Sequence, residues 1–342
     1  MTTQVAFLFP GQGSQAVGMG ADVFEASPAA RHVFESAGKA LGISLSTICF
    51  QGPDDVLRET INTQPAIVTV SLALLAALQE ALTEHTSSWS APLIPNYNAG
   101  HSVGEYAALV ASGALRLPDA VRLIRERGRL MHLEGTICPG SMVAVIGMDA
   151  EILQDVCQEA TAQSVATLGE VSHPGLGQVS IANFNAPGQI VISGEQGALN
   201  LAMELAKARG AKRIIPLSVS GAFHSPVMQP AAEGLARAIA GCEVHDATIP
   251  VIGNIHATPI TEAHDIREEL TQQIAAPVQW IRTIEYLVEA GVTTFLEIGP
   301  GQALTGMVKR IAKGVVTLNV SCKTDIEKVV GTIREIGLVD EV

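Results

Sequence analysis

The stretch YNAGHSVGEYAALVASGAL, Tyr97–Leu115, places Ser102 between Gly100 and Gly104. A short strand is expected directly before this serine, and a helix is expected from Val103 onward. In a nucleophile elbow the serine lies on a strained strand-to-helix turn, where side chains two residues before and after it would collide. The pattern therefore predicts that Ser102 is a nucleophile in an α/β fold. The alternative is a small residue in an ordinary tight turn.

Segments with the pattern of buried strands alternate with helical segments through most of the chain. Strands are expected at 5–9 (VAFLF) and 293–299 (TTFLEIG). A helix is expected at 28–41, and Thr63 and Pro65 are expected to open a longer one. This alternation predicts a mostly parallel sheet that is covered by helices on both faces.

The middle of the chain follows a different rhythm. Residues 141–217 have the order βαββαβ, which is the ferredoxin-like pattern. A loop without a core-forming period, at 166–177, separates its first helix from its second strand. We expect a large catalytic domain, residues 1–137 and 213–342, with an inserted small domain, residues 138–212.

Composition narrows the class of protein. The 342 residues are 47% hydrophobic and 16% charged, with a net charge of -13, so nucleic-acid binding is not expected. Five widely spaced cysteines without a CxxC pair favour reduced thiols over disulfides or a metal site. The apolar stretch at 65–82 is interpreted as a buried core helix and not as a membrane span. These features predict a cytoplasmic protein.

A serine nucleophile needs a base, which is usually histidine. Of the nine histidines, His224 in SVSGAFHSPVM follows a strand and a glycine turn, at the sheet edge where α/β sites collect. A turn residue that bonds local backbone is the alternative for His224. A hydrolase triad would also need an acid before the histidine, but Asp149 and Asp155 fall in the small domain and Asp119 opens a helix. The sequence therefore indicates a Ser–His pair that something other than an acid holds.

Seven motifs occur in one order between residues 9 and 307: FPGQGSQ, GHSVGEY, RERGRLM, ANFNAPGQIVISG, GAFHSPVM, PVQW and EIGPGQALTGM. In this combination the chain resembles the malonyl-CoA:acyl carrier protein transacylase family. The resemblance covers nearly the whole chain. It implies an α/β-hydrolase-like large domain with a ferredoxin-like insert, in agreement with the pattern above.

The resemblance implies roles for matching residues. Ser102 would be the acylated nucleophile and His224 its base. The backbone N–H groups of Gln12 and Val103 would form the oxyanion hole. The small apolar side chain of Val103 after the serine also goes with malonyl substrates in related acyltransferases.

Three further residues would bind or position the substrate. Arg127 would clamp the malonyl carboxylate, because a guanidinium offers two parallel N–H donors and stays charged when buried. The alternative for Arg127 is an exposed helix arginine. Gln273 would hold His224 through its backbone carbonyl, with Gln272 as a neighbouring candidate. The ring of Phe223 would narrow the space beside the base and favour malonyl over branched acyl groups.

The implied reaction is a ping-pong transfer of malonyl from malonyl-CoA, through Ser102, to the phosphopantetheine thiol of acyl carrier protein. Coenzyme A enters as a substrate thioester, and no cofactor is expected. A serine hydrolase and a non-catalytic carrier-binding subunit are the competing hypotheses, and both fatty-acid and polyketide pathways stay open. The basic segments at 207–213 and 309–313 are candidates for carrier contact, whereas the loop at 166–177 departs from the family pattern.

Overall fold

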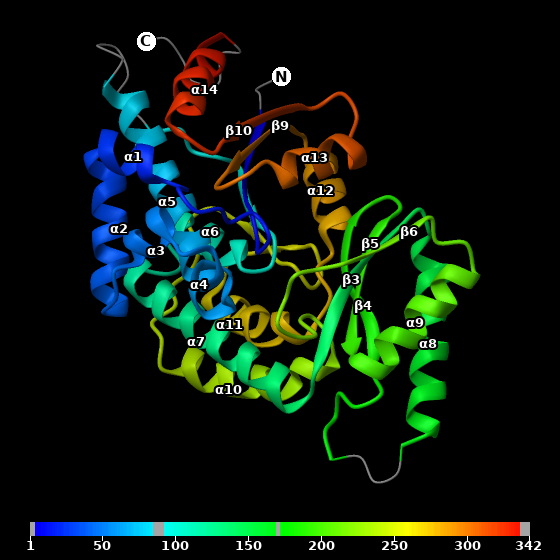
Figure 1. Ribbon diagram of the computed structural model, residues 1–342. Coiled ribbons are helices and arrows are strands. Elements are labelled where there is room, and N and C mark those ends of the chain that lie inside the picture. Colours follow the sequence, from blue (N-terminus) through cyan, green and yellow to red (C-terminus); the bar gives the residue numbers. More distant parts are fainter. Residues whose placement is uncertain (1–3, 85–91, 169–171, 336–342) are drawn as a thin grey trace.

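The computed structural model describes residues 4–84, 92–168 and 172–335, and it divides into a large α/β part and a smaller α/β part beside it (Figure 1). The strands of the large sheet, in spatial order, are β10 (Val316–Val320), β9 (Val292–Ile298), β1 (Gln4–Phe9), β2 (Tyr97–Gly100), β7 (Val251–Ile252) and β8 (Pro259–Ile260). All neighbouring strands pair in parallel except β7 and β8. The predicted mostly parallel sheet is confirmed.

The helices around the large sheet arise from segments before and after the insert. They are α1 (Ala21–Ala26), α2 (Pro28–Leu41), α3 (Leu45–Gln51), α4 (Asp54–Arg58), α5 (Thr60–Glu84), α6 (Gly104–Ala111), α7 (Leu117–Ile137), α10 (Gln229–Ala240), α11 (Ala263–Gln272), α12 (Trp280–Glu289), α13 (Ala303–Ile311) and α14 (Lys323–Glu335). Two short 3-10 helices, η1 (Pro226–Met228) and η2 (Gln273–Ala275), lie next to the candidate site.

The central strand β1 explains why its sequence is continuously apolar. Val5, Phe7 and Phe9 pack into a core that includes side chains of α2, α5 and α7. Ala6 and Leu8 pack on the opposite face, in a second core with residues of α12 and α13. Successive side chains of a strand point to opposite faces, so a strand buried on both faces needs an apolar residue at every position.

The small part has its own antiparallel sheet and hydrophobic core. Its elements follow the chain as β3 (Gly140–Ile146), α8 (Ala150–Ala166), β4 (Val179–Ala186), β5 (Gln189–Glu195), α9 (Gln196–Ala208) and β6 (Arg213–Pro216). The strands lie in the order β4-β5-β3-β6. Because β6 pairs with β3, this sheet extends past the predicted boundary at residue 212.

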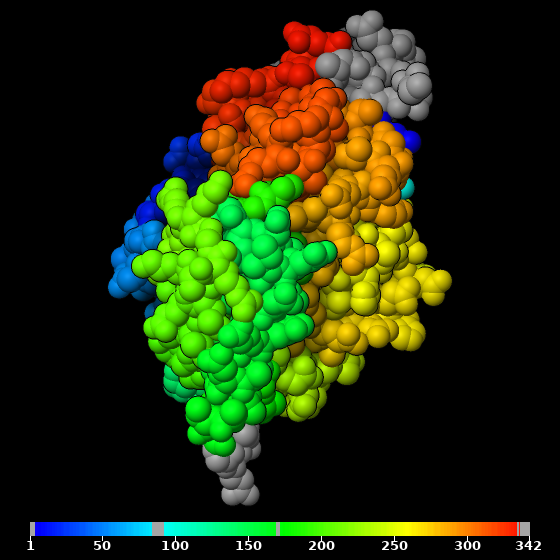
Figure 2. Space-filling model, turned by 90° about the vertical axis from the view of Figure 1, so that its right-hand side faces the viewer, coloured from blue at the N-terminus to red at the C-terminus, as the bar shows by residue number. Residues whose placement is uncertain are grey.

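The small part is joined to the large part along one edge. The N–H of Phe184 in β4 donates to the carbonyl of Val278 at 2.9 Å, and the N–H of Val278 donates to the carbonyl of Ala182 at 2.8 Å. Arg310 of α13 donates to the carbonyl of Pro187 at the β4–β5 turn, at 2.8 Å. Figure 2 shows the resulting face, on which the green insert lies against the orange segment that contains α12 and α13.

One detail of the large part differs from the sequence-based expectation. The long helix α5 begins at Thr60, so Thr63 and Pro65 lie inside its first turns and do not open it. Thr63 instead donates its hydroxyl to the carbonyl of Leu57, which ties α5 to the preceding helix α4. By length and composition α5 could cross a membrane, but 67% of its most apolar window is buried inside the protein, as the core-helix interpretation expects.

Candidate active site

The turn between β2 and α6 has the steric features of a nucleophile elbow. Ser102 adopts a φ of 51°, a left-handed conformation that non-glycine residues rarely occupy. A Cβ on Gly100 would lie 2.0 Å from the backbone of Gly104, and a Cβ on Gly104 would lie 2.1 Å from the carbonyl oxygen of Phe9. Gly100 is therefore required by the tightness of the turn itself, and Gly104 is required by the close approach of the turn to β1.

His224 is hydrogen-bonded to Ser102. Its Nε2 lies 2.7 Å from Ser102 Oγ, and its Nδ1 lies 2.9 Å from the carbonyl oxygen of Gln273 and 3.1 Å from that of Ala276. Carbonyl oxygens only accept, so Nδ1 carries the proton and Nε2 presents its lone pair to the hydroxyl. Burial, with help from the nearby charge of Arg127, lowers the pKa of His224 to about 3. The imidazole is therefore neutral at pH 7 and able to accept the serine proton.

Arg127 lies in the interior, with 1% of its surface exposed, so the alternative of an exposed helix arginine is wrong. Its Nη1 donates to Gln64 Oε1 at 2.7 Å, and its Nη2 donates to Gln273 Oε1 at 2.9 Å and to Ser102 Oγ at 3.2 Å. Each of these acceptors is neutral. The guanidinium is thus held beside the nucleophile with its positive charge unpaired by these contacts.

These groups surround one cavity of about 80 Å³. The predicted site residues that line it are Gln12, Ser102, Val103, Arg127, Phe223 and His224. In the described part of the chain, no hydrogen-bond acceptor is recorded for the backbone N–H of Gln12 or of Val103. Both donors are therefore free to bind an oxygen that develops negative charge in the cavity.

The structure also distinguishes between the two candidate glutamines. The predicted helix at 264–275 is divided into α11 and η2, and Gln273 is the first residue of η2 and fully buried. Its backbone carbonyl faces His224 and its side chain faces Arg127. Gln272 instead lies at the end of α11, where its amide contacts Glu268 at the surface.

Sequence reasoning missed three polar residues that hold the site. Asn254 accepts from the N–H of Ser102 and donates to the carbonyl of Gly100, both at 2.7 Å, so it braces the elbow from the segment after β7. Gln64 holds Arg127 from α5. Glu105 lies under the elbow and contacts Gln273. The available signal was a polar residue within an otherwise apolar stretch, which indicates a buried hydrogen bond.

The described part of the loop at 166–177 packs against the large part, while residues 169–171 lie outside the described residues. His173 Nε2 contacts Glu134 Oε1 of α7 at 2.6 Å, and both side chains are largely buried. A Cβ on Gly175 would lie 2.5 Å from Val227 in η1, which follows the base. The loop thus contacts α7, which carries Arg127, and η1, which follows His224.

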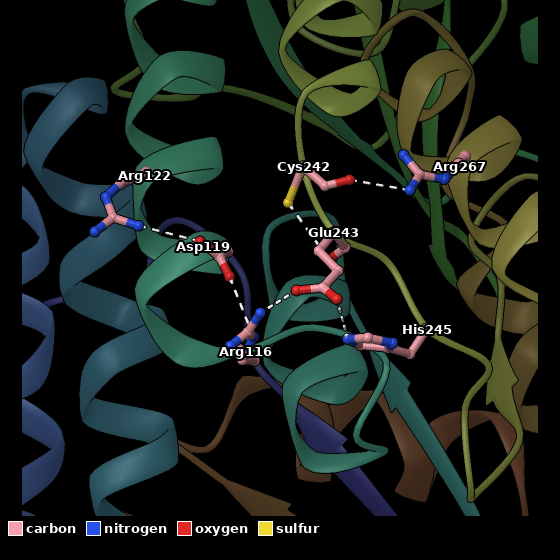
Figure 3. Close-up of polar contacts among 7 residues, drawn as sticks. All are labelled: Arg116, Asp119, Arg122, Cys242, Glu243, His245 and Arg267. Atoms are coloured by element: carbon pink, nitrogen blue, oxygen red, sulfur yellow. Dashed lines mark hydrogen bonds and ion pairs between the residues drawn. The ribbon is translucent and has the colours of Figure 1, made fainter.

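A network of charged and polar groups at the surface connects three helices of the site (Figure 3). Arg116, at the start of α7, contacts both Asp119 of that helix and Glu243 after α10. Arg267 of α11 donates to the carbonyl of Cys242 at 2.9 Å. Exposed ion pairs contribute little individually, about 0–1 kcal/mol. The network therefore adds little to the stability of the fold, and none of the residues in Figure 3 lines the cavity.

Among the described residues, no group of three or more His, Cys, Asp or Glu side chains is placed to hold a metal ion. The five cysteines are all free, and Cys49, Cys138 and Cys157 are buried. Burial raises the pKa of Cys49 and Cys157 to about 12, so these thiols are protonated and unreactive.

A serine on a strained elbow, a neutral histidine and two free backbone donors are the groups that serine acyl-transfer chemistry requires. The acyl transferase domain family matches residues 6–336 of the chain. Malonyl CoA-acyl carrier protein transacylase of Bacillus subtilis is 44% identical over 97% of this chain and 98% of its own length. The Escherichia coli K12 protein of the same name is 41% identical over 90% and 93%. The chain belongs to the malonyl-CoA:acyl carrier protein transacylase family, which confirms the predicted membership.

Solved structures agree with this placement. The malonyl CoA-acyl carrier protein transacylase of Coxiella burnetii matches with a TM-score of 0.86 and 37% identity, over 97% of this chain and 98% of that one. A malonyl-transacylase in complex with a type II polyketide synthase acyl-carrier protein also matches with a TM-score of 0.86 and 37% identity, over 96% of this chain and 100% of that one.

Proposed function

We propose that this enzyme transfers malonyl from malonyl-CoA to the phosphopantetheine thiol of acyl carrier protein, through an acyl-enzyme on Ser102. The observation that carries the proposal is the presence, in one cavity, of a neutral Ser–His pair and a buried arginine with neutral partners. The pair supplies the chemistry of acyl transfer, and Arg127 supplies a binding group for an acyl chain that ends in a carboxylate. The names of the relatives support the same reaction.

In the first half-reaction, Ser102 Oγ attacks the thioester carbonyl while His224 Nε2 takes its proton. The oxyanion of the tetrahedral intermediate is bound by the N–H groups of Gln12 and Val103. Collapse of the intermediate breaks the carbon–sulfur bond, and the imidazolium returns the proton to the departing coenzyme A thiolate. The product is malonyl-Ser102 and free coenzyme A.

The second half-reaction reverses these steps with a new thiol. His224 takes the proton of the carrier phosphopantetheine, and the thiolate attacks the malonyl ester. The same oxyanion donors act, and the imidazolium returns its proton to Ser102 Oγ. Throughout, the backbone carbonyls of Gln273 and Ala276 hold the imidazole in the tautomer that the reaction needs, which takes the place of a triad acid.

Two residues that line the cavity, Arg127 and Phe223, would determine substrate choice. A malonyl carboxylate would form charge-assisted hydrogen bonds to the guanidinium of Arg127, which acetyl lacks. The buried ring of Phe223 restricts the space beside the base and disfavours branched acyl groups. Malonyl-CoA and acyl carrier protein are the proposed partners, without a separate cofactor, nucleic acid or membrane, in the cytoplasm. The carrier of either a fatty-acid or a polyketide pathway is compatible with the site.

The fold supports the proposed assignment of the large and small domains. The strand order β4-β5-β3-β6 of the small sheet, with the helices α8 and α9 as its crossover connections, supports a ferredoxin-like insert. The elbow at the end of a strand in a mostly parallel sheet supports an α/β-hydrolase-like large domain.

The decisive experiment mixes the protein with malonyl-CoA in the presence and absence of holo acyl carrier protein. Intact mass spectrometry should show a malonyl adduct on the enzyme without carrier, and malonyl-carrier when carrier is added. Free malonate as the main product would establish a hydrolase, and the absence of both adduct and product would establish a non-catalytic carrier-binding protein.

A further inference from the structure

A buried carboxyl group that the reaction does not use lies under the nucleophile. Glu105 follows Gly104 at the start of α6, and its residue is 0% exposed. Its Oε2 accepts a hydrogen bond of 2.5 Å from Gln273 Nε2, whereas Oε1 has no recorded partner among the described residues. Burial of a carboxyl group costs free energy that only hydrogen bonds offset, so its contact with Gln273 is important for the site.

The amide of Gln273 has one orientation that satisfies all its neighbours. Its Nε2 donates to Glu105 Oε2 and to the carbonyl of Ser102, the latter at 2.9 Å. Its Oε1 is then directed at Arg127 Nη2, at 2.9 Å. A rotation of the amide by half a turn would place an NH₂ group against the guanidinium, which has only donors. The acceptor on Glu105 therefore favours the orientation that holds Arg127.

The carboxyl lies one side chain away from the arginine, with the Gln273 amide between them. Burial raises the pKa of Glu105 well above its usual range, and the carboxyl of Glu269 on α11 acts in the same direction. The Gln273 amide, the charge of Arg127 and the backbone of Asn254 act in the opposite direction. Burial is the largest of these influences, so the net shift of the Glu105 pKa is upward.

The position of the Gln273 amide between Glu105 and Arg127 matters for the binding of substrate. A carboxylate in direct contact with Arg127 would form a buried ion pair and compete with an incoming substrate carboxylate. A carboxyl group that acts through the Gln273 amide orients the guanidinium without a direct ion pair and leaves its charge for the substrate. We propose that Glu105 is a positioning residue for malonyl selection, because it fixes the Gln273 amide and thereby orients Arg127 without neutralising it. This inference rests on the proposed malonyl transfer.

The test measures kcat/KM for malonyl-CoA and acetyl-CoA in four variants. E105M keeps the volume but removes the acceptor, and E105D withdraws the acceptor by one methylene. Both should lower the malonyl-to-acetyl ratio about tenfold, mainly through a higher KM for malonyl-CoA, with acetyl transfer little changed. E105Q keeps a neutral acceptor at the same reach and should stay within about threefold of wild type. E134M, at a buried glutamate of α7 that contacts His173, is the matched control and should leave the ratio unchanged.

Each outcome decides the inference. A wild-type ratio in both E105M and E105D would overturn it, and E105D decides alone if E105M does not fold. A loss in E105Q as large as that in E105M would show that charge is needed, which also overturns it. An equal fall of malonyl and acetyl transfer would indicate a purely structural role for Glu105. Failure of the proposed function is separate, because wild type itself would then transfer no malonyl.

Discussion

Replacement of Arg127 by alanine tests the link between the buried guanidinium and substrate choice. The side chain is 1% exposed and lies within 3.2 Å of the nucleophile oxygen. Without it, a malonyl carboxylate would enter a buried cavity that no longer offers a cationic partner. An acetyl group has no charge that needs a partner. R127A should therefore lose malonyl transfer, and its preference should shift toward acetyl transfer.

The size of the effect follows from the contacts. Truncation of one partner of a buried, hydrogen-bonded charge pair costs about 2–5 kcal/mol. At about 1.4 kcal/mol per tenfold, this corresponds to a fall of about 30- to 3,000-fold in the malonyl-to-acetyl ratio of kcat/KM. Stability should fall as well, because Gln64 and Gln273 lose the donor that they now share.

The assay compares second-order rate constants for the two thioesters, with a thermal melt of each protein. R129A is the matched control, because Arg129 lies on the same helix but is half exposed and pairs with Glu126. R129A should keep the wild-type ratio. An unchanged ratio in folded R127A would refute the assignment of the carboxylate to Arg127, whereas an equal loss for both substrates with a lower melting temperature would indicate misfolding.

Three other outcomes are expected. S102A should form no malonyl adduct by intact mass, and an adduct on that variant would exclude Ser102 as the nucleophile. Since burial depresses the pKa of His224 from 6.5 to about 3, the unfolded chain binds a proton that the folded chain does not between these pH values. The free energy of unfolding should therefore decrease as the pH is lowered through this window, by at most about 1.4 kcal/mol per pH unit from this residue. Urea unfolding of wild type and H224Q at pH 7 and 5 should show a smaller decrease for H224Q, and equal decreases would contradict the shift. Charge reversal at Lys309 and Arg310 should raise KM for the carrier and leave KM for malonyl-CoA little changed, and equal effects on both would favour a coenzyme A phosphate site.

The elbow could be predicted because its constraints are local. The two glycines around Ser102 are required by backbone atoms that lie within a few residues or on the adjacent strand β1. The continuous apolar run of β1 likewise follows from burial on both faces. Such features depend on short-range sterics and periodicity, which can be predicted from the sequence alone.

The supporting residues could not be predicted in the same way. Asn254 contacts Ser102 across 152 positions of the chain, and Gln273 contacts Glu105 across 168. No periodicity connects such distant positions, so only the folded topology brings them together. Short elements were missed for a related reason. The helices α1, α3 and α4 span only five to seven residues, and β8 spans two, so their patterns are too brief to stand out.

Gln273 connects the catalytic part of the site with the substrate-binding part. Its backbone carbonyl holds the base, while its side chain holds the arginine and receives its orientation from Glu105. The backbone contact does not depend on the side chain, so selection can vary by substitution while the base stays in place.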